Sequence, residues 1–251
     1  MSNVVSYGAG TNSTALLIGL HERNERPDAI VFADTGGERP ETYAHIEVMN
    51  DWCKKVLFPE IITVRKGGRP ETLEENCLRM NMLPSIAYGY KSCSHKYKIE
   101  PQEKWANNDD ECRAEWKGGD KVTKLIGIDA DEHHRAKFTE DKKYLYRYPL
   151  VEWDWGRDEC VAAIVKAGID LPGKSACFFC PSSKTREILA LPKYLQDRAL
   201  ALEANAELTT IKGLGRNYAW SDLIRADKAQ GKFDFETRGD IPCGCYDGGL
   251  D

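Results

Sequence analysis

A short apolar strand, a glycine turn and an apolar helix follow one another at the start of the chain, and this succession constrains the fold most. Val4, Val5 and Tyr7 have the pattern of a buried strand, and a helix with an apolar side is expected from about Asn12. The turn between them, Gly8-Ala9-Gly10, consists of small residues that let the backbone bend tightly and approach a ligand closely. The new helix directs unpaired amides and its positive dipole end toward the same point. The pattern therefore predicts a phosphate-binding turn, with an ordinary strand-to-helix connection as the alternative.

Two common phosphate-binding motifs match this turn incompletely. A Walker-type loop needs a lysine before its serine or threonine, and no lysine lies between Gly8 and Leu20, so this motif is excluded. A dinucleotide fingerprint is matched in part, because Gly8 and Gly10 are present but Ser13 replaces the third glycine. Asp34, at the end of the next strand, agrees with that fingerprint. The polar side chains that open the helix are suited either to capping it or to binding phosphate oxygens: Asn12, Ser13 and Thr14.

Strands that alternate with helices predict an α/β fold with a doubly wound, mostly parallel sheet. Residues 29–33 and 60–64 read as buried strands, and Pro40 begins a helix between them. Ligands of such sheets bind beyond the carboxyl ends of the strands, where Gly8 and Asp34 are both expected. Asp34 is interpreted either as a turn residue that caps the following helix or as a ligand of a ribose hydroxyl or a metal ion.

Two further polar segments follow in the chain. Residues 91–101 place several cations around Cys93. Such cations lower the pKa of a thiol and suit the binding of an anion, and a solvated basic turn is the alternative interpretation. Residues 121–128 read as another strand, after which Arg135 is expected to contact a nucleotide, with Glu132 orienting it. A metal site at the adjacent histidines of this segment is the less favoured alternative, because neighbouring side chains on a helix point about 100° apart.

Length and charge set the class of protein. The 251 residues suit one large domain or a core with an appended lobe. The net charge of −5 argues against generic binding of nucleic acid, although a local basic patch is compatible with it. The sequence has neither a long apolar run nor the basic start of a signal peptide, so a cytoplasmic protein without membrane contact is expected.

Nine cysteines are the unusual feature of the composition. Two pairs are closely spaced, Cys177-Phe-Phe-Cys180 and Cys243-Gly-Cys245, and in a cytoplasmic protein such pairs indicate metal, cluster or redox chemistry rather than structural disulfides. Cys53 and Cys160 lie in apolar helical patterns and are expected to be core residues.

Taken together and in this order, the segments resemble the phosphoadenosine phosphosulfate (PAPS) reductase-like family of the adenine nucleotide α-hydrolase superfamily. Residues 8–14 are similar to the family's pyrophosphate (PP) loop Ser-Gly-Gly-Lys-Asp-Ser-Thr, of which they keep the second glycine, the serine and the threonine. Asp34-Thr35-Gly36 resembles its Asp-Thr-Gly strand end, and residues 93–101 resemble its Cys-x-x-x-x-Lys-x-x-Pro segment.

Two more segments extend the resemblance to about residues 4–183. Residues 127–135 resemble the family's Gly-x-Arg-x-x-Glu-x-x-x-Arg stretch, although Asp129 stands where an arginine is usual and Arg135 comes one position early. Pro149-Leu150 through Trp153 resembles its Pro-Leu-x-x-Trp. The resemblance implies a Rossmann-like nucleotide-binding domain over residues 1–190, with a helical extension and a cysteine-containing tail, 191–251, packed on it.

The resemblance also implies the ligands. An adenine nucleotide, ATP or a sulfonucleotide such as PAPS or APS, would bind with Mg²⁺ to residues from three strand ends: Ser6, Gly8, Gly10, Thr11, Asn12, Ser13, Thr14, Asp34, Thr35, Gly36 and Gly127. A four-iron [4Fe-4S] cluster would bind to Cys93, Cys177 and Cys180, with Cys243, Cys245 or Cys77 as the fourth ligand. Zinc held by Cys177, Cys180, Cys243 and Cys245 is the alternative, and no metal is the third.

The function expected from the resemblance is ATP-dependent adenylylation of an acceptor, in sulfur transfer or in modification of a nucleic acid or metabolite. Lys98 and Arg135 would stabilise the charge that develops on the α-phosphate. A thiol-dependent sulfonucleotide reductase that releases sulfite is the first alternative, with Cys245 as its nucleophile, although the tail lacks the glutamate and histidine of that family's motif. A non-catalytic nucleotide-binding protein is the second alternative. The sequence determines neither the acceptor nor the oligomeric state.

Overall fold

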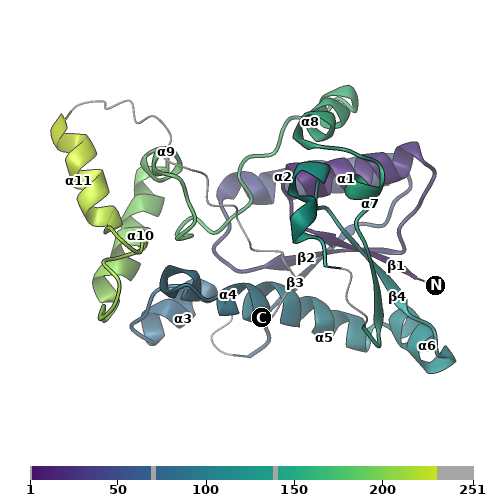
Figure 1. Cartoon of the computed structure of the whole chain (residues 1–251), viewed down its shortest axis with the longest axis horizontal. Coiled ribbons are helices and arrows are strands. Elements are labelled where there is room, and N and C mark those ends of the chain that lie inside the picture. The colour runs from purple at the N-terminus through teal and green to yellow at the C-terminus, as the bar shows by residue number, and fades with distance from the viewer. Residues whose placement is uncertain (1, 69–71, 138–140, 231–251) are drawn as a thin grey trace.

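The computed structural model describes residues 2–68, 72–137 and 141–230, which contain a five-stranded sheet flanked by helices (Figure 1). The order of the strands is β3-β2-β1-β4-β5, and every neighbouring pair is parallel. The strands are β1 (Asn3–Tyr7), β2 (Ala29–Asp34), β3 (Ile61–Arg65), β4 (Val122–Ile126) and β5 (Tyr144–Arg147). The predicted doubly wound α/β class with a helical C-terminal part is confirmed.

The central strand β1 is the point where the direction of winding reverses. Val5 pairs with Ile30 of β2 on one side and with Leu125 of β4 on the other. From β1 the chain proceeds outward through β2 to β3, and it later returns to form β4 on the opposite side. In sheets of this kind a crevice opens between the carboxyl ends of the two strands where the order reverses. The ligand crevice of such a sheet is therefore expected between β1 and β4.

Helices cover both faces of the sheet because successive side chains of each strand point to opposite faces. On one face Val5 and Phe32 belong to a core shared with α1 (Thr11–Glu22), α2 (Pro40–Lys55), α7 (Pro149–Glu152) and α8 (Arg157–Lys166). On the other face Val4 and Val31 belong to a core shared with α5 (Glu100–Asn108) and α6 (Asp110–Gly118). Figure 1 shows these two layers on opposite sides of the strands.

Besides the cores on the two faces of the sheet, a separate core, which we call the second core, lies beside the sheet and joins distant parts of the sequence. Its large buried side chains include Tyr97, Phe178, Phe179 and Trp220. The elements around it are α3 (Leu73–Arg79), η1 (Ser85–Tyr88), α4 (Ser92–Ser94), the π-helical η2 (His95–Ile99), α9 (Thr185–Leu189), α10 (Lys193–Asn205) and α11 (Trp220–Gln230). The C-terminal helices consequently pack on residues 73–97 as well as on the Cys177 segment.

Among the elements that the sequence pattern did not predict are α5, α6 and β5. Strand β5 lies at the edge of the sheet, is four residues long and leaves Leu145 exposed. Its sequence, Tyr-Leu-Tyr-Arg, therefore lacks the continuous apolar run that marks a strand buried on both faces. Helices α5 and α6 follow directly on the basic segment and carry many charged side chains, so their apolar sides are narrow.

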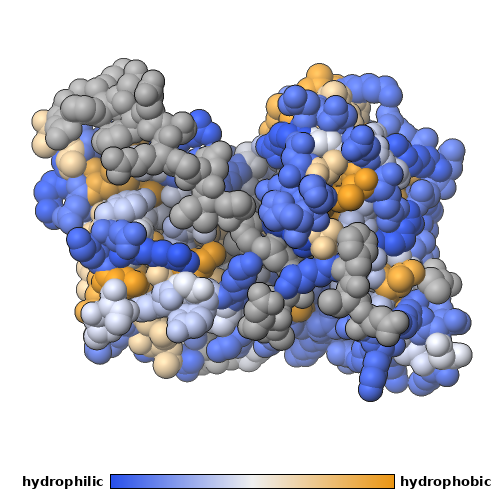
Figure 2. Space-filling model, viewed as in Figure 1, coloured by the Kyte–Doolittle hydropathy of each residue, from blue (hydrophilic) through white to orange (hydrophobic). Residues whose placement is uncertain are grey.

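Within the described ranges, no helix has the length and apolar character needed to cross a membrane. Figure 2 shows one face of the molecule on which hydrophilic side chains predominate and hydrophobic side chains form small, separate patches.

A buried carboxylate fixes the last helix of the described chain. Glu203 of α10 accepts hydrogen bonds from the backbone N–H groups of Leu214 (2.8 Å), Trp220 (2.8 Å) and Ser221 (2.9 Å). The side chain is buried, and a Cβ on Gly213 would lie 2.4 Å from its Oε2 atom. Glu203 thus satisfies amides at the start of α11 and holds the preceding loop against α10.

We expect Glu203→Ala to lower the free energy of unfolding by about 3 kcal/mol, because it leaves buried amides without an acceptor. Glu207→Ala is the matched control, since Glu207 is exposed and accepts one side-chain bond from Asn81. The control should change stability by less than about 0.5 kcal/mol in urea denaturation. Equal losses in the two variants would contradict the role assigned to Glu203.

Candidate functional site

The glycine turn lies at the carboxyl end of β1 and opens α1. Gly10 is the N-cap of α1 in an extended conformation, and it has no side chain with which to cap the amides of the first helical turn. Its own N–H donates to Ser13 Oγ (3.2 Å), and Ala9 has a positive φ of 55°, which is uncommon for a residue other than glycine. The turn thus exposes the start of α1 at the edge of the sheet where the crevice is expected.

Gly127 packs against the first turn of α1 at the same edge of the sheet. It follows β4 directly, and a Cβ at this position would lie 3.0 Å from the backbone of both Asn12 and Ser13. Beyond it, Asp129 is buried and accepts a hydrogen bond from Asn12 Nδ2 (2.8 Å). A side chain at this position would press on the first turn of α1, so the close packing of Gly127 helps to fix where that turn lies.

The carboxylate of Asp34 is surrounded by donors of the protein itself. Oδ1 accepts from the Gly36 N–H (2.7 Å) and the Tyr43 hydroxyl (2.8 Å), and Oδ2 accepts from Arg65 Nε (2.8 Å) and Nη2 (2.6 Å). The residue is buried, and the N-cap of the following helix is Arg39 instead. Asp34 therefore anchors the turn after β2, and the expectation that it caps α2 is not met.

A segment near the second core crosses over to the glycine turn. The Ser175 hydroxyl donates to the carbonyl oxygen of Gly8, and the Phe178 N–H donates to the carbonyl oxygen of Gly37 (2.8 Å). Between these contacts, Cys177 and Glu38 form an isolated antiparallel bridge. We call residues 175–178 the clasp, because they join the glycine turn to the turn after β2.

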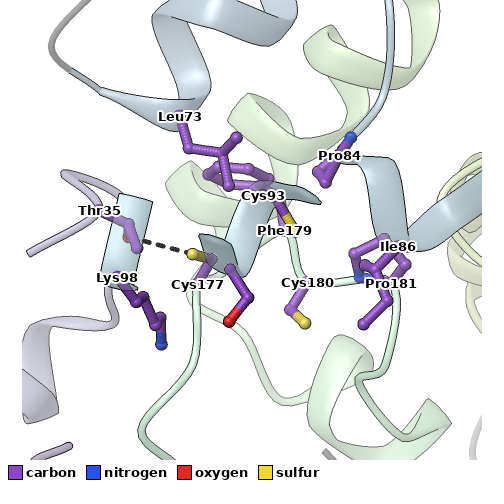
Figure 3. A pocket seen from close by; sticks show the side chains of 11 residues that line it. Thr35, Leu73, Pro84, Ile86, Cys93, Lys98, Cys177, Phe179, Cys180 and Pro181 are labelled. Carbon is purple, nitrogen blue, oxygen red and sulfur yellow. Dashed lines mark hydrogen bonds between the residues drawn. The ribbon is translucent and has the colours of Figure 1, made fainter. Parts of the chain in front are cut away.

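Three cysteines brought together by the clasp line one pocket (Figure 3). Cys177 belongs to the clasp, Cys180 follows it in the chain, and Cys93 lies in α4. The other lining residues are mainly apolar: Thr35, Leu73, Pro84, Ile86, Ser94, Lys98, Phe179 and Pro181. The sequence therefore identified a set of cysteines that the fold places around a common space.

A chain of polar contacts connects Cys177, Thr35, Glu38 and Lys98 at the wall of this pocket. Cys177 Sγ lies 3.1 Å from Thr35 Oγ1, and the Thr35 hydroxyl donates to Glu38 Oε1 (3.1 Å). Lys98 Nζ lies 3.5 Å from the same Glu38 oxygen, and the Glu38 side chain is fully buried. Lys98 is thus placed in the thiol pocket with a carboxylate as its partner.

As they stand in the structure, no three or more His, Cys, Asp or Glu residues of the described ranges are grouped so that they could hold a metal ion. Cys93, Cys177 and Cys180 share the pocket, but the sulfur of Cys177 is hydrogen-bonded to Thr35. Cys243 and Cys245 lie outside the described residues. A cluster, zinc, and the choice of a fourth ligand therefore stay predictions.

The four remaining described cysteines are enclosed in the cores. Burial raises the pKa of each of these thiols to about 12: Cys53, Cys77, Cys112 and Cys160. The assignment of Cys53 and Cys160 to the core is confirmed. Cys77 lies in the second core and is almost fully buried, which disfavours the thiolate that a metal ligand needs.

The remaining predicted residues are distributed as follows. Thr14 is buried and its hydroxyl lies 2.9 Å from His45 Nε2 and 3.2 Å from the Tyr7 hydroxyl, so it belongs to the core beneath the turn. The buried Ser6 hydroxyl likewise donates to Gln102 Oε1 (2.6 Å). Thr11 and Ser13 are largely buried in the first turn of α1.

Arg135 closes the short 3₁₀ helix η3 (Ala130–Arg135) and forms the predicted ion pair with Glu132. Three residues of the site escaped sequence reasoning: Glu38, Arg157 and Ser175. Glu38 follows a strand end that the sequence did single out, but a charged residue in a turn gives no sign that it is buried. The other two are recognised only through contacts with distant residues.

No protein-family model matches this chain, and no curated protein sequence matches it. Among solved structures it is similar to the U34-tRNA thiolase NcsA from Methanococcus maripaludis with its [4Fe-4S] cluster. The two chains are 14% identical, the alignment covers 95% of this chain and 84% of that one, and the TM-score is 0.43. A likeness at this level assigns neither a family nor a function.

The raised thiol pKa values predict selective alkylation. At pH 8 iodoacetamide should modify the half-buried Cys93 faster than the four enclosed thiols of Cys53, Cys77, Cys112 and Cys160, because burial keeps these four protonated and only the thiolate reacts. The rates for the four core cysteines should rise with pH up to the point of unfolding. Peptide mass mapping measures the rates, and the unfolded protein, in which all thiols should react alike, is the control. Rapid labelling of Cys77 in the native protein would contradict this account.

Arg65→Ala tests the anchor at Asp34. It removes two of the four donors of a buried carboxylate, so we expect a loss of about 2 kcal/mol in the free energy of unfolding. Arg113→Ala is the control, because Arg113 forms an exposed ion pair with Asp110 in α6. This variant should lower the free energy of unfolding by less than about 0.5 kcal/mol. Urea denaturation measures both, and an unchanged stability for Arg65→Ala would show that the anchor is dispensable.

Proposed function

We propose that this chain is a PP-loop, PAPS reductase-like enzyme that activates an acceptor with ATP. In this reaction an oxygen of the acceptor attacks the α-phosphate, pyrophosphate leaves, and a sulfur donor later displaces AMP from the adenylylated acceptor. Sulfur transfer, or modification of a nucleic acid or a metabolite, is the class of process. The observation that carries the proposal is the clasp, which is hydrogen-bonded to Gly8 of the glycine turn and contributes Cys177 to a pocket lined by two further thiols.

The glycine turn supports the nucleotide part of the proposal. Its backbone is held by Gly127 at the crevice of a doubly wound sheet, which is where ligands of such sheets bind. The start of α1 lacks a capping side chain at Gly10, and uncapped amides at a helix N-terminus bind phosphate. Magnesium bound to the phosphates would neutralise part of their charge.

The thiol pocket supports the sulfur part. Thiols that lie near an activated acceptor are suited to deliver sulfur themselves or to hold a cofactor that does so. Cys93, Cys177 and Cys180 would supply three ligands of a [4Fe-4S] cluster or of zinc, and Cys243 is proposed as the fourth. Lys98, which lines the same pocket, would place positive charge beside these thiols.

A sulfonucleotide reductase is the second candidate, because a pocket of thiols beside a nucleotide turn also suits attack on the sulfur of PAPS or APS. The products separate the two functions. The adenylylating enzyme releases AMP and pyrophosphate from ATP, whereas the reductase releases sulfite from the sulfonucleotide. Purified protein with Mg²⁺ and ATP, with and without total RNA as acceptor, tests the first. Sulfite from PAPS or APS without AMP from ATP would favour the second.

Gly127→Ala tests the nucleotide site without knowledge of the acceptor. The new Cβ would press on the backbone of Asn12 and Ser13 and displace the turn, so we expect roughly 10-fold weaker binding of ATP in calorimetry. Gly118→Ala is the control, because its Cβ would approach no neighbouring atom more closely than 3.9 Å. Unchanged affinity of the Gly127 variant, together with normal folding, would remove the glycine turn from the nucleotide site.

A further inference from the structure

We infer that Arg157 binds the terminal phosphates of the nucleotide and thereby supplies a positive charge that the glycine turn lacks. The inference rests on the proposed function, since it assigns a residue to the same nucleotide site. Arg157 is the first residue of α8 and lies far from the turn in the sequence.

The charges around the turn make such a residue necessary. Residues 8–14 contain neither lysine nor arginine. The nearest charged side chain at the end of β4 is the buried carboxylate of Asp129, hydrogen-bonded to Asn12 in the first turn of α1. A carboxylate beside the first turn of α1 repels a polyphosphate bound there, so a cation that reaches this turn would favour binding.

Two cations named from the sequence already face carboxylates of the protein. Lys98 is paired with the buried Glu38 in the thiol pocket, and Arg135 is paired with Glu132 within η3. Their charges are therefore compensated, at least in part, before a nucleotide arrives. Neither pair includes a residue of the glycine turn.

Arg157, in contrast, contacts Asn12 in the first turn of α1, directly after the glycine turn. Its Nη1 donates to Asn12 Oδ1 (3.3 Å), while Asn12 Nδ2 donates to Asp129 Oδ2 (2.8 Å). The amide of Asn12 thus has both ends fixed, and its oxygen is directed toward the guanidinium. Helices α1 and α8 pack against each other (Figure 1), and Asn12 and Arg157 lie in the first turn of each.

The base of the Arg157 side chain is held in place. Its backbone N–H donates to Asp131 Oδ2 (2.7 Å), and a Cβ on the preceding Gly156 would lie 2.8 Å from the same oxygen. The side chain itself is exposed, so the guanidinium can reach a ligand while the backbone of Arg157 stays in place. A guanidinium carries five N–H donors in a planar fork, which matches two oxygens of a phosphate, and the contact with Asn12 occupies one donor.

The test compares nucleotides that differ only in the number of phosphates. Calorimetry with Mg²⁺ measures the Kd of ATP and of AMP for the wild type and for Arg157→Gln. We expect ATP to bind roughly 10- to 100-fold more weakly to the variant, while the Kd of AMP changes by less than about twofold. Arg157→Lys, which keeps the charge but not the fork, should recover part of the affinity for ATP.

Arg113→Gln is the matched control, because it removes another exposed arginine, on the opposite face of the sheet, and should leave both constants unchanged. Binding of ATP to Arg157→Gln within twofold of the wild type would overturn the inference and leave the proposed function standing. An equal loss for ATP and AMP would also overturn it, because the residue would then act through the shape of the site. A wild-type chain that binds neither nucleotide would overturn the proposed function as well.

Discussion

The contact between Gly127 and the first turn of α1 is the constraint on which the site depends. The register of β1 with β4, in which Ser6 pairs with Ile126, places the residue after β4 directly against Asn12 and Ser13. At 3.0 Å from backbone atoms, even a methyl group would force a shift of the turn. The parallel strands β1 and β4 end at the same edge of the sheet, so the glycine turn and the segment that begins with Gly127 meet there. This is the edge at which ligands of doubly wound sheets bind.

The clasp extends this constraint to the second core. Residues 175–178 bind Gly8 on one side and Gly37 on the other, while Phe178 and Phe179 are buried among the C-terminal helices. The thiol pocket consequently forms where the sheet and the second core meet, from α4, the turn after β2 and the Cys177 segment. Its geometry depends on packing that includes α10 and α11, so loss of these helices would disturb the pocket at a distance.

Buried carboxylates organise the polar part of this edge. Asp34 is held by Arg65 and Tyr43, Glu38 by Thr35 and Lys98, and Asp129 by Asn12. Buried charges are stable only with such partners, so each carboxylate orders the residues around it. The same pairing compensates Lys98 within the protein, whereas the exposed Arg157 meets the turn through the neutral amide of Asn12.

The sequence by itself determined the elements whose signals are local. The apolar runs of β1, β2 and β4 and the helix after Pro40 all follow from periodicity and turn residues over a few positions. The close pair Cys177 and Cys180 and the glycine turn were visible for the same reason. Only the tertiary structure decided that Arg65 binds Asp34 and that Thr14 lies against His45. It also decided that Glu38 is buried close to Cys177 and that Arg157 contacts Asn12. These roles depend on partners far apart in the chain, and no local pattern encodes the distance between two such side chains.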